Sequence, residues 1–490
     1  MKRNLSRLIV VCAFLAFAAL ASQQHSPDLG EQSARISRIE AGLLTAVTIK
    51  GRPAPTMTIA DRMSYYKVPG VSVSYFDHGR ILWTRAYGLA DIAAKKPITS
   101  ETLFQAASIS KPVAALAMMR LVQDGKLSLD EDVNAKLRTW KVPENEFTKE
   151  NKVTLRRVAS HSAGLTVHGF PGYASDEPVP SIIQILNGEA PANTPAIRVD
   201  AVPGTLWRYS GGGYVIMQLL LTDVTKKPFP KIIHDLVLEP AGMAHSTYEQ
   251  PLPQTLAAGA ATPYRDSGEP VKGGWHTYPE MAPAGLWTTP SDLARFAIEV
   301  QNEYAGKSST ILSQEMMRQM LSAQKDDYGL GFGLAHSGEA LRFGHGGANE
   351  GFRCSLDAYA RTGQGLVIMT NSDGGDRLIN EYRRAVAKEY GWPDFKPIER
   401  SLVVVDPKVL SHYAGTYEIP GIDTFTITLK DSSLRLSVGG AAPEELFSES
   451  DTRFFVLSRN ITFDFQKSNT QAAKLLFNTG TQTYEALRIP

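Results

Sequence analysis

The order of strand-like and helix-like segments constrains the fold of this chain more than any other feature. Residues with the alternating pattern of strands occur near the start and again late in the sequence, at 68–75, 81–88, 341–345, 352–356 and 366–370. Segments with the helical spacing of apolar residues lie before, between and after them, at 33–47, 111–122, 214–224, 229–238 and 378–390. This order predicts an α/β domain whose first and last segments meet in one antiparallel sheet.

The apolar period changes to two beyond a linker expected at 391–397, which contains glycine and two prolines. Phe425, Ile427 and Leu429 alternate with threonines, and similar alternation recurs at 434–438 and 461–465. Short strands at such close spacing predict a small all-β barrel or sandwich. We therefore expect an α/β domain over 32–398 and a second domain over 404–490.

The first 21 residues are typical of a secretory signal. Lys2, Arg3 and Arg7 lead into an apolar run that ends on Ala-Leu-Ala at 19–21, a small-x-small cleavage pattern. The run is too short to span a bilayer comfortably, which favours cleavage over the alternative, an uncleaved anchor. We therefore expect an exported protein, periplasmic or extracellular, with no membrane span after cleavage.

Composition limits the classes of function. The chain has 490 residues, of which 43% are hydrophobic, enough for two domains with substantial cores. Signal cleavage removes three positive charges and no negative ones, so the formal net charge changes from +1 to −2. Without basic blocks, nothing indicates a nucleic-acid partner. Metal-ligand, phosphate-loop and dinucleotide motifs are missing from the sequence, so we expect no metal and no cofactor.

Cleavage would leave Cys354 as the single cysteine, which excludes an intramolecular disulfide. This thiol has two interpretations, a nucleophile or a small buried filler within a strand. The second is favoured, because unpaired cysteines are commonly buried and behave as small apolar groups.

The segment Ser-Ile-Ser-Lys at 108–111 opens a long apolar helix that Gly125 is expected to stop. Residues i and i+3 share one helix face, so the Ser108 hydroxyl and the Lys111 amine can come within hydrogen-bond reach. A serine becomes a good nucleophile when a neighbouring base takes its proton, and a desolvated lysine can be that base. Pro112 is tolerated near a helix start, which places Ser108 where free N–H groups favour developing negative charge.

Two further motifs follow in order. Tyr-Ser-Gly-Gly-Gly-Tyr at 209–214 stands just before a helix, and His-Gly-Gly at 345–347 stands at the expected end of a strand. Together with Ser108 and Lys111, and with the phrases at 156–165 and 285–293, they resemble the serine β-lactamase and penicillin-binding-protein superfamily, particularly its class C and D-aminopeptidase or esterase branches. That resemblance covers roughly 32–398, and it implies an antiparallel sheet flanked by helices plus an all-helical region. The segment at 413–418 resembles the start of a lipocalin-like barrel often appended to such enzymes.

The resemblance implies a catalytic role for three side chains. Ser108 would be the acylated nucleophile and Lys111 its proton partner. Tyr209 takes the first position of the Y-x-N element, where the phenol or phenolate acts with the lysine as base and later protonates the leaving group. An alternative interpretation of Tyr209, a core aromatic side chain that covers a loop, remains open.

The resemblance also implies how the substrate carbonyl is held. His345 takes the position of the lysine in K-T-G, and Gly346 and Gly347 let a substrate approach the strand edge closely. The backbone N–H groups of Ser108 and Ala348 would form the oxyanion hole. The alternative for this motif is a glycine turn with a histidine that faces solvent.

His161 and Ser162 also suggest a Ser–His pair. They are neighbours within one loop phrase, however, so packing or hydrogen bonding is the favoured interpretation of both.

Two departures from the family pattern bear on the substrate. Gly211 replaces the expected asparagine, which removes a side-chain amide and leaves the support of Lys111 unassigned. His345 is mostly uncharged at pH 7, since an unperturbed imidazole titrates near ~6.5, and so it grips a substrate carboxylate weakly. Both changes favour ester or peptide substrates over penicillin-type acids.

The sequence therefore predicts an exported serine hydrolase that acts through an acyl-enzyme on an ester or amide, including D-amino-acid peptides, without metal or cofactor. A protein that binds or senses β-lactams or cell-wall peptides without turnover, a weak β-lactamase, and an interaction protein that acts through its barrel are the alternatives. The preferred stereochemistry and the oligomeric state stay open.

Overall fold

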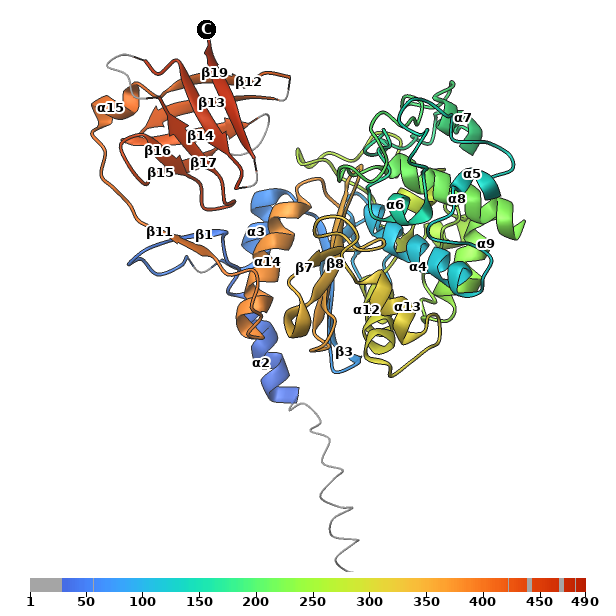
Figure 1. The fold of residues 1–490 in the computed structure, drawn as a ribbon. Helices are drawn as coiled ribbons and strands as arrows, with labels where there is room; N and C mark the ends of the chain where they lie inside the picture. Colours follow the sequence, from blue (N-terminus) through green and yellow to red (C-terminus); the bar gives the residue numbers. More distant parts are fainter. Residues whose placement is uncertain (1–28, 56, 422, 439–442, 467–470, 481) are drawn as a thin grey trace, which may run out of the picture.

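A computed structural model describes residues 29–55, 57–421, 423–438, 443–466, 471–480 and 482–490. The signal sequence expected at 1–21 lies outside these ranges. Figure 1 shows a sheet-and-helix domain and, beside it, a separate barrel formed by the C-terminal part of the chain. Within the described ranges, every helix is too short or too polar to cross a bilayer.

A seven-stranded antiparallel sheet forms the centre of the larger domain. Its strands are β2 (Gly70–Asp77), β3 (Arg80–Asp91), β4 (Lys96–Pro97), β7 (Gly333–Ala335), β8 (Arg342–Asn349), β9 (Phe352–Tyr359) and β10 (Gly365–Thr370). They lie in the order β4-β3-β2-β10-β9-β8-β7, so β2 pairs with β10, and every neighbouring pair is antiparallel. The prediction that the first and last segments of this domain meet in one sheet is confirmed.

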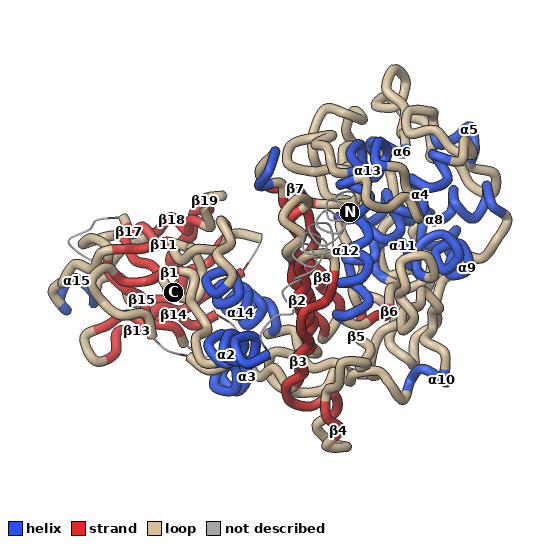
Figure 2. The backbone as a smooth tube through the Cα atoms, turned by 90° about the horizontal axis from the view of Figure 1, so that it is seen from below, coloured by secondary structure: helices blue, strands red, loops and turns tan. Residues whose placement is uncertain are grey.

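Helices cover both faces of this sheet, as Figures 1 and 2 show. On the barrel side lie α2 (Leu29–Glu40), α3 (Ile59–Tyr66) and α14 (Gly375–Glu389). On the other side lies α12 (Pro290–Ala305), followed by the helical region. Residues of β2 point alternately to the two faces of the sheet. Val71 and Val73 pack in the core with α2, α3 and α14, and Phe76 packs in the core with α12 and the helical region.

The helical region packs around two long buried helices, α4 (Ser110–Gln123) and α8 (Gly211–Thr225), which confirm the helices expected over 111–122 and 214–224. Shorter helices surround them: α5 (Val133–Lys136), α6 (Leu155–Ala159), α7 (Ile182–Asn187), α9 (Phe229–Ile233), α10 (Gln254–Ala257), α11 (Met281–Ala284) and α13 (Gln314–Met320). Single turns and short strands complete the domain: the 3₁₀ turns Ala107–Ile109 and Gly338–Ala340, the π-helical turn His234–Leu238, and the pair β5 (Phe104–Gln105) and β6 (Trp287–Thr288).

Two differences in bounds change the interpretation of an expected element. The helix expected over 33–47 ends at Glu40, because the chain becomes extended there and the Leu43 N–H donates to the carbonyl of Met57 instead. The strand expected over 341–345 continues to Asn349, so the His-Gly-Gly motif lies inside β8 and not at its end. The sequence also gave no sign that β1 (Val47–Ile49) pairs in parallel with β11 (Ile398–Arg400), just after the linker.

The C-terminal domain is a closed barrel, which decides between the barrel and sandwich expected from its sequence. Helix α15 (Pro407–Ser411) precedes eight antiparallel strands: β12 (Gly415–Ile419), β13 (Asp423–Lys430), β14 (Ser433–Val438), β15 (Glu444–Ser448), β16 (Arg453–Phe455), β17 (Thr462–Phe465), β18 (Lys474–Asn478) and β19 (Thr483–Ile489). Buried aromatic residues, among them Tyr417, Phe425 and Phe463, pack inside it. Closure removes exposed strand edges, which would otherwise be available to pair with another chain.

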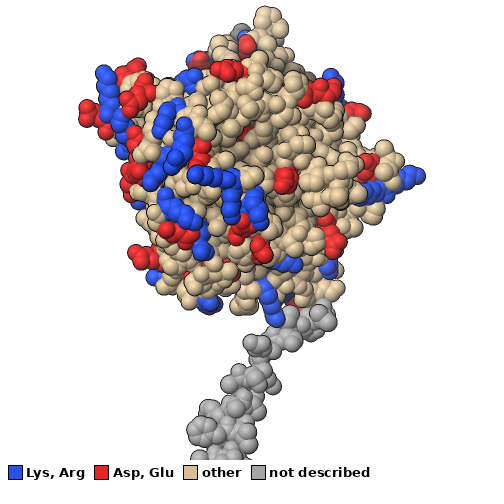
Figure 3. Space-filling view, turned by 90° about the vertical axis from the view of Figure 1, so that its right-hand side faces the viewer, with Lys and Arg blue, Asp and Glu red and all other residues tan. Residues whose placement is uncertain are grey.

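The face of the larger domain opposite the barrel carries charges of both signs. Figure 3 shows lysine and arginine side chains interspersed with aspartate and glutamate, while much of the middle of this view carries neither. A face of this kind creates no strong field of one sign.

Candidate active site

The first turn before α4 brings Ser108 and Lys111 together. Ser108 lies in the 3₁₀ turn Ala107–Ile109, two residues before the first residue of α4. The Lys111 Nζ atom lies 2.9 Å from the Ser108 Oγ atom and also donates to the carbonyl oxygen of Pro283 at 2.9 Å. The Pro283 carbonyl therefore supplies the support for Lys111 that the absence of an asparagine at 211 left unassigned.

Burial changes the acid–base character of Lys111. The side chain is 2% exposed, and burial lowers its pKa to about 7. An ammonium ion is poorly solvated in such a site, so the neutral amine is favoured. Near neutral pH a substantial share of the molecules therefore holds an amine that can accept a proton from Ser108.

Tyr209 lies over this amine. The Lys111 Nζ atom is 4.9 Å from the centre of the Tyr209 ring. Burial raises the pKa of the Tyr209 phenol, and a hydrogen-bonding interaction with Ser108 opposes this shift only in part. Ser210 fixes the tyrosine, because it caps α8 by accepting from the Gly213 N–H at 3.1 Å. The structure thus brings Ser108, Lys111 and Tyr209 into one cluster.

His161 belongs to the same cluster but does not pair with Ser162. Its Nδ1 atom accepts from the Ser210 N–H at 3.1 Å, and its ring centre lies 4.2 Å from that of Tyr209. Burial, followed by the nearby Lys111, lowers the pKa of His161 well below its usual range. The Ser162 hydroxyl instead bonds that of Ser160 at 3.0 Å. The favoured interpretation, packing and hydrogen bonding, agrees with this geometry.

Strand β8 presents the His-Gly-Gly motif beside the nucleophile. Strand β7 pairs with β8 only along Arg342 to Gly344. The part of β8 from His345 onward therefore lies beyond the end of this pairing with β7. His345 stands at the start of this stretch, 6.0 Å from Tyr209 between ring centres. Its Nδ1 atom donates to the Gly346 carbonyl at 2.5 Å, and burial lowers the pKa of His345 to about 3. The imidazole is therefore neutral across the physiological range.

The packing of β8 against the nucleophile turn requires a glycine at position 347. A Cβ atom there would lie 2.2 Å from the Ala106 carbonyl oxygen and 2.4 Å from the Cys354 Sγ atom. Gly347 lies against Ala106. Ala348, the exposed residue that follows Gly347, therefore lies beside the turn that holds Ser108. Gly346 is exposed, and a Cβ atom there would make only an ordinary van der Waals contact, 3.9 Å from the Cys354 carbonyl oxygen.

Cys354 is a buried residue of β9, as its favoured interpretation required. It is 3% exposed, and its thiol donates to the Ala106 carbonyl at 3.0 Å. Burial raises the pKa of this thiol, which disfavours the reactive thiolate.

Phe170 occupies the space in front of Gly211. A Cβ atom at 211 would lie 2.9 Å from the Phe170 Cε2 atom and 3.1 Å from the His168 carbonyl oxygen. An asparagine side chain therefore has no room here unless the loop 168–170 moves. The glycine at 211 is thus required by the packing of Phe170 and the His168 carbonyl against it.

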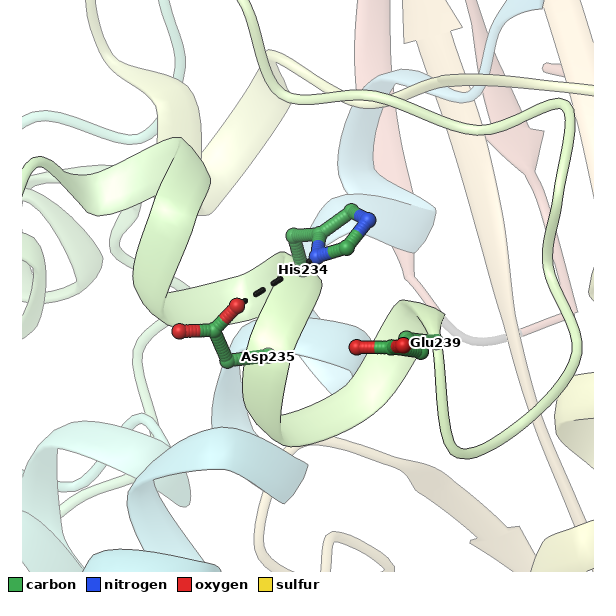
Figure 4. Close-up of side chains that lie close together, drawn as sticks. All are labelled: His234, Asp235 and Glu239. Atoms are coloured by element: carbon green, nitrogen blue, oxygen red, sulfur yellow. Dashed lines mark hydrogen bonds and ion pairs between the residues drawn. The ribbon is translucent and has the colours of Figure 1, made fainter.

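One group of possible metal ligands occurs among the described residues, and it shares no residue with this cluster. Figure 4 shows His234 and Asp235 on the π-helical turn and Glu239 just after it, and their ligand atoms lie within 4.8 Å of one another. The Asp235 carboxylate already pairs with Lys231 at 2.7 Å and Lys227 at 3.1 Å. Since its charge is compensated and the group is largely exposed, we assign no metal site there.

A buried carboxyl group lies next to the segment that supports Lys111. Glu280 precedes α11, is fully buried, and neither of its oxygens has a hydrogen-bond partner of good geometry among the described residues. Burial raises the pKa of Glu280 to about 8, although its own N–H and the Tyr173 hydroxyl lower it in part. Sequence reasoning missed this residue because a lone glutamate carries no signal of its burial.

Glu280 is expected to make the protein less stable as the pH rises. The folded state binds this proton more tightly than the unfolded state, so the free energy of unfolding falls between about pH 4.5 and pH 8, at up to about 1.4 kcal/mol per pH unit. Glu280→Gln should remove this slope, as measured by denaturant unfolding at pH 5, 7 and 8.5. The exposed Glu249→Gln serves as control. A slope unchanged by Glu280→Gln would contradict the expectation.

Two family models match the chain. Residues 56–389 match the family described as "Beta-lactamase", and residues 399–486 match "Domain of unknown function (DUF3471)". The second match covers all eight barrel strands except the last residues of β19.

Individual proteins show the same similarity. Penicillin-binding protein 4* of Bacillus subtilis is 24% identical over 84% of this chain and 93% of its own length, and esterase EstB of Burkholderia gladioli is 31% identical over 40% of this chain and half of its own length. Among solved structures, the octameric penicillin-binding protein homologue from Pyrococcus abyssi has a TM-score of 0.60 at 22% identity, covering 88% of this chain and 98% of that one.

A D-amino acid amidase from Ochrobactrum anthropi has a TM-score of 0.54 at 21% identity, covering 73% of this chain and 99% of that one. At these identities the solved structures show the fold alone. The family match spans the sheet, the helical region and the cluster around Ser108, so this chain belongs to the beta-lactamase family, with a C-terminal eight-stranded barrel.

Proposed function

We propose that this chain is a serine hydrolase that forms an acyl-enzyme on Ser108 and cleaves an ester or an amide, D-amino-acid peptides included. The observation that carries the proposal is the 2.9 Å contact between the Ser108 Oγ atom and a buried amine whose pKa is lowered to about 7. A serine with such a base beside it is an activated nucleophile.

Proton transfers follow from the protonation states in the cluster. Neutral Lys111 takes the Ser108 proton while the Oγ atom attacks the substrate carbonyl, and the backbone N–H groups of Ser108 and Ala348 bind the oxyanion. The Tyr209 phenol, kept protonated by its raised pKa, then donates to the leaving group and regains a proton from Lys111. Water releases the acyl group from Ser108 by the reverse transfers. Covalent attachment to serine divides one difficult step into two.

The surroundings of this cluster favour substrates without a carboxylate. His345 is neutral, and Phe170 fills the place of an amide at 211, so neither provides the cation or amide that would hold a penicillin-type acid. The names of two similar proteins, an esterase and a D-amino acid amidase, agree with this class of substrate. We further propose, from the sequence at 1–21, that the protein is exported.

Three probes test the function against its alternative, a protein that binds β-lactams or cell-wall peptides without turnover. We expect a fluorophosphonate to label the intact protein on Ser108, located by peptide mass spectrometry, and p-nitrophenyl acetate to be hydrolysed continuously. A stable label from a fluorescent penicillin without release of p-nitrophenol would favour the binding protein. A protein that reacts with none of these would direct attention to the barrel as the functional part.

A further inference from the structure

The residue before the nucleophile has a strained backbone. Ala107 has φ = +48°, in the left-handed region that residues with a Cβ atom rarely adopt. Such a conformation persists only where neighbouring contacts impose it, and it places Ser108 in the turn that faces Lys111. The contacts that impose it therefore control the position of the nucleophile.

Ser110 supplies the most direct of these contacts. This serine, between the nucleophile and the lysine, is fully buried. Its hydroxyl donates to the carbonyl oxygen of Ala107 at 2.5 Å and accepts from the Leu286 N–H at 3.0 Å. The hydroxyl thereby joins the strained residue to a backbone segment 176 residues further along the chain.

The same segment also holds the base. Pro283, three residues before Leu286, accepts from the Lys111 amine, and the Leu286 carbonyl accepts from the Ala106 N–H at 2.8 Å. The stretch 283–286 thus fixes the turn and the amine together. The Ser110 hydroxyl links this stretch to the carbonyl of the strained residue itself.

We propose that Ser110 is a positioning residue that keeps Ala107 in its left-handed conformation and so holds the Ser108 hydroxyl within reach of Lys111. The inference rests on the proposed acyl-enzyme function. It predicts that loss of the Ser110 hydroxyl slows acylation without changing the pKa of the base, because that pKa is lowered by burial of Lys111, whose bond to the Pro283 carbonyl does not involve Ser110.

Ser372 provides a matched control for the structural part of the effect. It is also fully buried, and its hydroxyl also joins two backbone groups, donating to the Lys67 carbonyl at 3.1 Å and accepting from the Gly374 N–H at 3.2 Å. Ser372→Ala therefore removes the same kind of bridge away from the cluster. An effect common to both variants is structural, and an effect confined to Ser110→Ala reports on the turn.

The experiment compares full-length variants by their rate of fluorophosphonate labelling and by kcat/KM on p-nitrophenyl acetate from pH 5 to 9. We expect Ser110→Ala to lower both by about 10–100-fold, since a displacement of about 1 Å can cost that much, with the midpoint of the pH profile unchanged. Ser372→Ala should change them less than about twofold. Ser110→Cys, whose thiol is a weaker donor in the same place, should give an intermediate rate and covers the case in which Ser110→Ala does not fold.

A second substitution, Ala107→Gly, gives a measurement that would not change if Ser110 only stabilised the fold. Glycine adopts φ near +50° without strain, so Ala107→Gly should restore several-fold of the lost rate in the Ser110→Ala protein. Wild-type rates in Ser110→Ala, equal losses in Ser372→Ala, or no recovery with Ala107→Gly would each overturn the inference. If the unmodified protein is not labelled at Ser108, the proposed function itself fails, which is a separate result.

Discussion

Ser108→Ala is expected to lower kcat/KM for p-nitrophenyl acetate by about 10⁴–10⁶-fold, the loss typical of removing a serine nucleophile. The substitution removes the oxygen that receives the 2.9 Å hydrogen bond from Lys111. The fold should persist, because the residue is half-buried, one atom is lost, and Lys111 keeps its bond to the Pro283 carbonyl. Circular dichroism and thermal unfolding check the fold, and steady-state kinetics with fluorophosphonate labelling check the activity.

Ser162→Ala is the matched control for this prediction, because it also tests whether Ser162 could act as the nucleophile. The Ser162 hydroxyl bonds that of Ser160 and not His161, so this variant should retain activity and labelling. A folded Ser108→Ala protein that still hydrolyses the ester, or a label that moves to Ser162, would contradict the acyl-enzyme on Ser108.

Much of the fold could be predicted because apolar periodicity reports which residues are buried. The strands at 352–356 and 366–370 and the helix at 214–224 differ from the observed elements by only a few residues at each end. The predicted end of the first helix at residue 47 was wrong, because Leu43 and Leu44 are buried in an extended segment and not on a helix. Apolar side chains alone do not distinguish these two cases.

The cluster around Ser108 could be predicted in its side chains but not in its backbone contacts. Spacing places Ser108 and Lys111 on one side of a turn, and motif order adds Tyr209 and His345. The Pro283 carbonyl that supports Lys111 left no trace in the sequence, since any residue offers a carbonyl. The lowered pKa of His345 was equally hidden, because it depends on burial by residues far apart in the chain.

Lys111 is expected to set the pH dependence of the reaction. The ratio kcat/KM should rise with pH around a midpoint near 7, because the neutral amine becomes the dominant form there. The sequence alone would assign an acid limb to His345 near pH ~6.5, but the pKa of His345 is about 3. If the midpoint near pH 7 disappears from the profile of kcat/KM when Lys111 is replaced and His345 is kept, the rise in activity with pH is due to the Lys111 amine.

Two replacements of Lys111 separate charge from basicity. Lys111→Arg keeps a cation that cannot lose its proton near neutral pH, and Lys111→Met keeps an apolar side chain of similar length. Both should lower kcat/KM by about 10³-fold or more, since neither accepts the Ser108 proton. An active arginine variant would contradict the role of the neutral amine, because it would show that a fixed cation is sufficient.

The stability of Lys111→Met should change in the opposite direction from its activity. The unfolded chain binds the Lys111 proton more tightly than the folded protein, so burial of this lysine costs stability most below pH 7 and progressively less up to about pH 10.5. The methionine variant should therefore be more stable at pH 7, on the order of 2 kcal/mol after the loss of two hydrogen bonds. This excess should be gone at pH 9.5, because the cost of burying the lysine falls by about 3 kcal/mol between the two pH values. A buried amine that weakens the fold and is required for turnover is retained for its chemistry. A methionine variant less stable than the wild type at pH 7 would instead indicate that Lys111 serves the packing.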